Sequence, residues 1–189
     1  MGGEGADPDD LAIVAQVRGG DRERFAVLVA RYERMVFALA MRMTGSRDEA
    51  QDVMQSSFLA AYRQLGDFRG DASFKTWLYG IALNDCRMLY RKAGRTTPLD
   101  AIAEPAAPVP GGHVLDRITL GRLVGRLPEK QRAAVLLRVC DDLSFREIGE
   151  IVGSSEASAK VNFSHAVKKL RAWLVPGAAA AATDEDEEA

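Results

Sequence analysis

Hydrogen-bond donors are concentrated near the end of the chain, where no acidic residue occurs between Glu156 and the C-terminal tail. The donor-bearing residues of this stretch are Ser155, Ser158, Lys160, Asn162, His165, Lys168 and Lys169. Lysines neutralise phosphates, whereas hydroxyl, amide and imidazole groups pair with base edges in a major groove. The stretch therefore predicts a surface that binds DNA. A helical hairpin with a solvated lysine face is the alternative, and His165 alone is weak evidence.

A second set of candidate residues surrounds the string Phe68-Arg69-Gly70, which we expect to form an exposed loop before a helix. The candidates that follow this string are Asp71, Ser73, Lys75, Asn84, Arg87, Arg91 and Lys92. Aromatic and amide groups between cations suit unstacked bases, which need a π-face, edge hydrogen bonds and phosphate neutralisation. Phe74, Trp77 and Ile81 are expected to be core residues, and spacing alone leaves the role of Phe68, Arg69 and Asn84 open.

Catalytic chemistry has no support in the sequence. There is no HExxH, phosphate-binding glycine loop, nucleophile motif or carboxylate cluster, so we expect no catalytic residue, metal site, cofactor or small-molecule substrate. Cys86 and Cys140 belong to no CxxC motif, which fits a reducing cytoplasm. The glycine-rich, acidic N-terminus is unlike a signal peptide, and no apolar run is long enough for membrane insertion.

The elements that must position both sets of candidate residues are helices. Between Asp21 and Thr44 the apolar residues follow the spacing of one buried helical stripe. They are Phe25, Leu28, Val29, Tyr32, Val36, Leu39, Ala40 and Met43. Gly45 should end this helix, and residues 46–49 (Ser-Arg-Asp-Glu) predict a capping box for the next one. A short helix near residues 11–17 and a long one from about Ala72 complete the first lobe.

Helical patterns return at residues 115–127, at 129–139 behind Pro128, at 144–152 and from Ser155 to Leu174. Ser144 and Glu147 predict a second capping box, and Gly153 predicts a left-handed helix end with Ser154 or Ser155 capping the last helix. Small Ala159 and Ala166 would allow two helices to approach closely, as a helix-turn-helix requires. The expected fold is all-α, with two small helical domains.

Charge is distributed unevenly along the chain, although the formal net charge is only −2. Residues 21–95 hold 13 basic and 9 acidic residues, and residues 116–175 hold 11 and 7, so each lobe carries +4. We expect a disordered N-terminus at 1–9, a first domain at 10–95, a flexible linker at 96–113, a second domain at 114–175 and an acidic disordered tail at 176–189. Two mildly basic lobes with acidic flanks favour nucleic acid as a partner.

The motifs resemble one known family. The run from Asp48 to Gln55, continuing through Phe68-Arg69-Gly70 to Thr76-Trp77-Leu78, resembles region 2 of the extracytoplasmic-function (ECF) sigma factors. Leu127 to Arg132 and the helix-turn-helix after it resemble region 4 of the same proteins. The resemblance covers both lobes in the expected order.

This resemblance implies a sigma factor that directs promoter-specific transcription initiation and has no catalysis of its own. Core RNA polymerase would contact region 2 through its β′ clamp helices, at Asp48, Asp52, Gln55 and Phe58, and would contact region 4 through its β flap. The −10 element would be read by Phe68, Arg69, Gly70, Asp71, Ser73, Lys75 and Asn84, with Arg87, Arg91 and Lys92 along the backbone. The −35 element would be read by the helix from Ser155. An anti-sigma factor is the expected regulatory partner.

Two departures from the family pattern stand out. The family usually has an acid after Gln55, where this chain has Ser56, and arginines are common where Asn162 and His165 stand. A helix-turn-helix repressor and a sigma mimic that binds only an anti-sigma protein are the alternatives. The promoters, the inducing signal, the identity of the anti-sigma factor, the role of the acidic tail and the arrangement of the free lobes are left open by the sequence.

Overall fold

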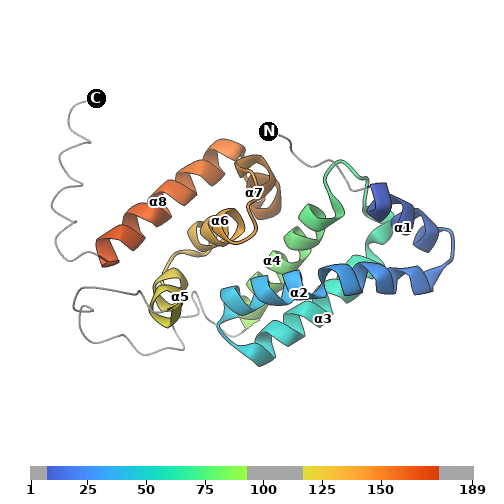
Figure 1. Ribbon diagram of the computed structural model, residues 1–189, viewed down its shortest axis with the longest axis horizontal. Helices are drawn as coiled ribbons and strands as arrows, with labels where there is room; N and C mark the ends of the chain where they lie inside the picture. Colours follow the sequence, from blue (N-terminus) through green and yellow to red (C-terminus); the bar gives the residue numbers. More distant parts are fainter. Residues whose placement is uncertain (1–7, 93–116, 175–189) are drawn as a thin grey trace.

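The computed structural model describes residues 8–92 and 117–174, and every regular element in these two ranges is helical. In chain order they are α1 (Pro8–Arg18), η1 (Arg22–Arg24), α2 (Phe25–Thr44), α3 (Arg47–Arg63), η2 (Leu65–Asp67), α4 (Phe74–Lys92), α5 (Arg117–Gly125), α6 (Glu129–Val139), α7 (Phe145–Val152) and α8 (Glu156–Leu174). Figure 1 shows α1–α4 gathered in one lobe and α5–α8 in a second lobe beside it. The prediction of an all-α fold with two helical lobes is confirmed.

Helix α2 carries the predicted stripe. Six of its eight members are buried, while Val29 and Tyr32 are partly buried against the same core. Gly45 ends the helix in the left-handed region, with φ 74°, and donates its N–H to the Met41 carbonyl at 2.9 Å. The Ser46 side chain then accepts from the Glu49 N–H at 3.4 Å and caps α3. Gly45 and the Ser46 side-chain cap are therefore as expected, but the Ser46 N–H donates to the Thr44 hydroxyl at 3.3 Å, so only the Ser46 half of the predicted capping box is formed.

Several helix ends differ from the expected ones. The segment from Asp21 opens with the 3-10 turn η1 instead of an α-helix, and α1 already begins at Pro8, inside the segment expected to be disordered. Pro128 has ψ 146° and is the residue before α6, not its first helical residue. The predicted linker at 96–113 and tail at 176–189 lie outside the described residues.

The second lobe contains the predicted helix-turn-helix. Ser144 and Glu147 form the reciprocal capping box that starts α7, and Gly153 ends it with φ 68°. A Cβ at Gly149 would lie 2.9 Å from the Ser154 carbonyl oxygen, so only glycine allows the chain to turn back this closely. Ser155 then caps α8 by accepting from the Ser158 N–H at 3.1 Å.

The two lobes are in contact, an arrangement that the sequence left open. Arg132 of α6 is 0% exposed. Its guanidinium donates to the Met43 carbonyl at the end of α2 (3.0 Å) and to the Leu127 carbonyl of its own lobe (3.1 Å). Burial lowers the pKa of this guanidinium. Alongside it, Arg87 of α4 donates to the Glu129 carboxylate at 2.5 Å. A second ion pair links Arg42 of α2 to Asp141 at 3.7 Å, so one buried cation and two ion pairs join the lobes.

Candidate nucleic-acid interface

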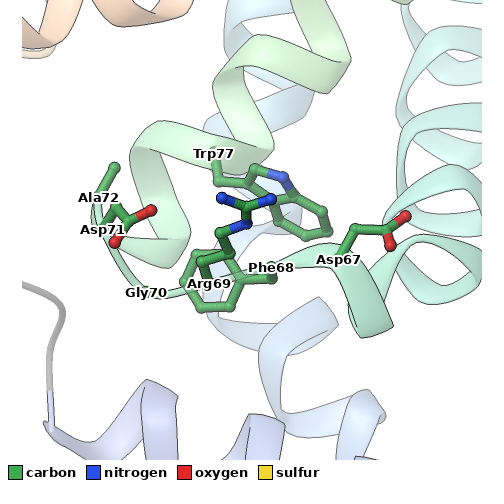
Figure 2. Close-up of a pocket in the computed structure, with 7 residues that line it drawn as sticks. All are labelled: Asp67, Phe68, Arg69, Gly70, Asp71, Ala72 and Trp77. Atoms are coloured by element: carbon green, nitrogen blue, oxygen red, sulfur yellow. The ribbon is translucent and has the colours of Figure 1, made fainter.

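The loop between η2 and α4 encloses a hollow of about 210 Å³. It is lined by Asp67, Phe68, Arg69, Gly70, Asp71, Ala72 and Trp77. Figure 2 shows the carboxylates of Asp67 and Asp71 on opposite sides of this hollow, away from the indole of Trp77. Small-molecule sites usually enclose roughly 300–1,000 Å³. The hollow is therefore of a size for a single planar ring, and its floor is aromatic.

Phe68 does not have the exposure that the sequence predicted. Its side chain is 4% exposed, and its ring meets those of Phe74 at 5.7 Å and Trp77 at 5.1 Å between centroids. The expectation of an exposed Phe68 was therefore wrong, because the ring completes an aromatic cluster. Arg69 is the exposed member of the string, and Gly70 follows it with φ 79°.

Trp77 lines the hollow, although sequence reasoning assigned it to the core alone. It is only partly buried, and its other contacts are to Phe68 and Phe74. Its position one helical turn after the loop was the available signal. Ser73, by contrast, is used for capping: its hydroxyl accepts from the Thr76 N–H at 3.0 Å and lies 2.9 Å from the Thr76 hydroxyl. Trp77 is therefore better placed than Phe68 to stack on a base in this loop.

The outer face of α4 presents most of the remaining candidates. Asn84, Arg91 and Lys92 are exposed, and Lys75 is partly exposed. Arg87 differs from them because its guanidinium is occupied by Glu129 and lies 3.5 Å from the Val152 carbonyl of the second lobe. With the two lobes in contact, four of these five polar side chains face outward, and the fifth, Arg87, is held between the lobes.

Helix α3 exposes Asp48, Asp52 and Gln55 on one surface, but Phe58 is only 8% exposed. Phe58 was expected on the polymerase-binding surface, and its ring lies in the core instead.

Ser56 has a specific partner that accounts for the missing acid at this position. Its hydroxyl donates to the Asp85 carboxylate of α4 at 3.0 Å, and that of Ser57 donates to the same oxygen at 2.9 Å. An acidic residue at position 56 would bring a second carboxylate against Asp85, which is unfavourable. The serine therefore fits its surroundings, and Asp85 places a carboxylate next to position 56.

Helix α8 presents the donors predicted for the second lobe. Ser155, Ser158, Lys160, His165, Lys168 and Lys169 are exposed. Asn162 is partly buried, and its side-chain N–H donates to the Ser158 carbonyl at 2.9 Å. The opposite face holds Ala159, Ala166 and Leu170 in the core, with Phe163 edge-on to Phe145 at 5.5 Å. The predicted buried and donor faces are thus both present.

Other kinds of site are not found in the described ranges. Residues 8–92 and 117–174 hold no group of three or more histidine, cysteine, aspartate or glutamate side chains placed to bind a metal. Within the same ranges no helix has the length and apolar character to cross a membrane. Burial raises the pKa of the Cys86 thiol to about 12, which leaves it protonated and unreactive at neutral pH.

Comparisons with known proteins agree with this division into lobes. Residues 28–96 match the family model Sigma-70 region 2, and residues 117–170 match Sigma-70, region 4. The RNA polymerase sigma-H factor of Pseudomonas aeruginosa is 36% identical over 158 residues, which cover 76% of this chain and 82% of that protein. The ECF RNA polymerase sigma-E factor of Escherichia coli K12 is 37% identical over 158 residues with the same coverage.

A solved structure has the same fold. The structure of CnrH in complex with the cytosolic domain of CnrY superposes with a TM-score of 0.65 at 29% identity, covering 86% of this chain and 95% of CnrH. The sigma factor RpoE from Bartonella quintana, solved in complex with the anti-sigma factor NepR, has a TM-score of 0.64 at 22% identity, with 79% and 96% covered. The latter likeness extends to the fold alone.

Proposed function

The chain belongs to the ECF sigma factors, and we propose that it binds core RNA polymerase and directs initiation at promoters by reading their −10 and −35 elements. The observation that carries this proposal is that both lobes match sigma regions in order, each with a surface suited to its part of the promoter. Sigma factors are initiation factors and not catalysts in themselves, so we assign the chain no reaction of its own. Its place of action would be the cytoplasm, where polymerase and DNA are found.

The −10 reader in this proposal is the hollow of the first lobe. A base extruded from the duplex would enter against Trp77, with Arg69 beside it, and exposed Asn84, two turns further along α4, would offer its amide to the edge of a neighbouring base. Stacking of a base on an aromatic ring contributes about 1–3 kcal/mol, and a hollow of single-ring size suits one base. Phe68 would act from below, by holding the aromatic cluster in place.

The −35 reader is the exposed face of α8. The capped N-terminus of this helix and its donors, without an acid after Glu156, suit a major groove. Lys160, Lys168 and Lys169 would contact phosphates, whereas Ser158, Asn162 and His165 would face bases. Asn162 would have to exchange its bond to the Ser158 carbonyl for one to a base.

The polymerase surface is proposed to be α3, where Asp48, Asp52 and Gln55 share an exposed face. The clamp helices of β′ would lie along it, and the β flap would contact the second lobe. Membership of the family also implies control by an anti-sigma factor. CnrH, which has a similar structure, was solved in complex with the cytosolic domain of CnrY.

Run-off transcription with core RNA polymerase and genomic DNA fragments tests the proposal. Discrete start sites that require this protein are the expected result. Binding to duplex DNA without initiation would instead favour a helix-turn-helix repressor, and binding to an anti-sigma protein without polymerase would favour a sigma mimic.

The −10 assignment is tested with Asn84→Ala and Arg69→Ala. Each should impair promoter melting while the affinity for core polymerase stays at the wild-type value, and Arg22→Ala, at an exposed arginine of η1, serves as the control. Normal initiation by both variants would show that the loop and α4 are not the −10 reader. Phe68→Ala is a poorer probe, because it removes a buried ring and so alters stability as well.

A further inference from the structure

Helix α1 lies outside the segment that matches sigma region 2, yet it contacts the candidate −10 loop at two points. In Figure 1 it sits at the end of the first lobe remote from α5–α8, so these contacts are independent of the way the lobes meet. The first point of contact is Arg18 at the C-terminal end of α1. The second is Leu11 near the other end.

Arg18 holds the backbone that leads into the loop. Its Nε donates to the Leu65 carbonyl at 3.0 Å, and one of its terminal nitrogens reaches the carbonyls of Leu65 (2.5 Å) and Gly66 (3.1 Å) as well as that of Phe68. The Phe68 carbonyl belongs to the peptide that joins it to Arg69. A planar, always charged guanidinium thus fixes the direction in which the chain enters the loop.

Leu11 supports the loop from its far side. One of its methyl carbons would lie 3.3 Å from a Cβ built at Gly70, the residue with φ 79°. Between these two points run Phe68 and Arg69, which line the hollow.

Helix α1 is itself anchored firmly. Asp10, 1% exposed, accepts from Arg31 at 2.5 Å and from the Tyr32 hydroxyl, both on α2. The Tyr32 ring in turn meets Phe74 at 5.6 Å, and Phe74 is part of the aromatic cluster beneath the loop. Burial and the neighbouring Asp10 carboxylate raise the pKa of the Tyr32 hydroxyl, which therefore stays a donor. The support is continuous from α2 through α1 to the loop.

We infer that Arg18 is a positioning residue for −10 recognition: it presets the loop so that the hollow is open before DNA arrives. This inference rests on the proposed function of the loop. A loop that is ordered in advance binds its ligand more tightly, because binding then has no entropy cost of ordering the loop. Loss of Arg18 should therefore weaken capture of the extruded base and leave the polymerase and −35 surfaces unaffected.

The experiment uses holoenzyme formed with wild type, Arg18→Ala, Arg18→Lys, Arg69→Ala and the control Arg22→Ala, an exposed arginine of η1. The probe is a fluorescein-labelled non-template strand of about 12 nucleotides from a promoter mapped by run-off transcription. A second series replaces each base of the −10 element by an abasic site. Affinity for core polymerase and for a −35 duplex is measured in parallel.

Arg18→Ala should bind the strand about tenfold more weakly, equivalent to about 1.4 kcal/mol. Its penalty for the abasic site at the extruded position should also shrink towards that of the other positions. Lysine keeps the charge but cannot span three carbonyls, so Arg18→Lys should restore only part of the affinity. Arg22→Ala should match the wild type.

Three results would overturn the inference. Wild-type strand binding by Arg18→Ala together with a defect in Arg69→Ala would refute the role of Arg18 while the proposed −10 reader stands. Equal losses of Arg18→Ala on the strand, the −35 duplex and polymerase would show general unfolding instead of positioning. Wild-type binding by both Arg18→Ala and Arg69→Ala would refute the −10 reader itself, and the inference with it.

Discussion

The buried guanidinium of Arg132 offers a direct measure of how strongly the two lobes depend on each other. Its bonds to the Met43 and Leu127 carbonyls each involve a charged donor, and such bonds contribute about 1.5–3 kcal/mol. Together they amount to about 3–6 kcal/mol. Methionine removes them but recovers apolar packing and spares the cost of burying a charge. We therefore expect Arg132→Met to lower the free energy of unfolding by about 2–4 kcal/mol.

The two tryptophans allow each lobe to be followed separately, since Trp77 lies in the first and Trp173 in the second. Urea unfolding is recorded by fluorescence in the Trp173→Phe and Trp77→Phe backgrounds. Before the Arg132 change both tryptophans should report one midpoint. After it, the Trp173 midpoint should fall below that of Trp77, because the small second lobe loses its hydrogen bond to the Met43 carbonyl of α2.

Exposed Arg122→Met on α5 is the matched control and should change stability by no more than about 0.5 kcal/mol. A loss below about 1 kcal/mol for Arg132→Met, with the two tryptophans still reporting a common midpoint, would refute the view that this side chain couples the lobes.

Three further predictions concern separate parts of the molecule. Gly149→Ala should destabilise the second lobe by about 1–3 kcal/mol in thermal unfolding and weaken −35 duplex binding, because its Cβ would meet backbone atoms. The control Gly121→Ala, whose Cβ would have nothing within 4 Å, should be neutral or stabilising. Equal effects of the two substitutions would contradict this prediction. Lys160→Ala and Lys168→Ala should each reduce the slope of log affinity against log salt by about 0.9, and an unchanged slope would remove that lysine from the phosphate contacts. Iodoacetamide at about pH 8 should label Cys140 and spare Cys86, since burial keeps the Cys86 thiol protonated below a pKa of about 12; mass spectrometry showing equal labelling in the folded protein would contradict this.

Local signals in the sequence were sufficient for most of the fold. The stripe of α2, the caps at Ser46 and Ser144 and the left-handed glycines 45 and 153 depend on interactions within a few residues, which spacing and residue type reveal. The helix starts were less well predicted, since a 3-10 turn such as η1 has the same composition as a helix.

The errors at the candidate site have a different cause. Phe58 and Phe68 were expected on binding surfaces, but both are buried. The Phe68 ring packs on Phe74 and Trp77, a contact that depends on how the loop folds back onto α4 and not on helical spacing. Arg132 and Arg18 were overlooked for the converse reason. An arginine ordinarily indicates a solvent-exposed position, but these two side chains donate hydrogen bonds to backbone carbonyls far away in the sequence. Carbonyl acceptors are invisible in a sequence because every residue has one.

The ion pair between Arg87 and Glu129 places a carboxylate of the protein in competition with the phosphates of DNA. Under the proposed assignment Arg87 contacts the DNA backbone. With the two lobes in contact, however, its guanidinium is held by a carboxylate of the other lobe. Because that carboxylate is tethered, its effective concentration is of the order of millimolar or more, and phosphate must displace it. An acid in the −35 lobe would thereby restrain the −10 lobe, and Glu129→Gln should strengthen DNA binding at a distance from either reader.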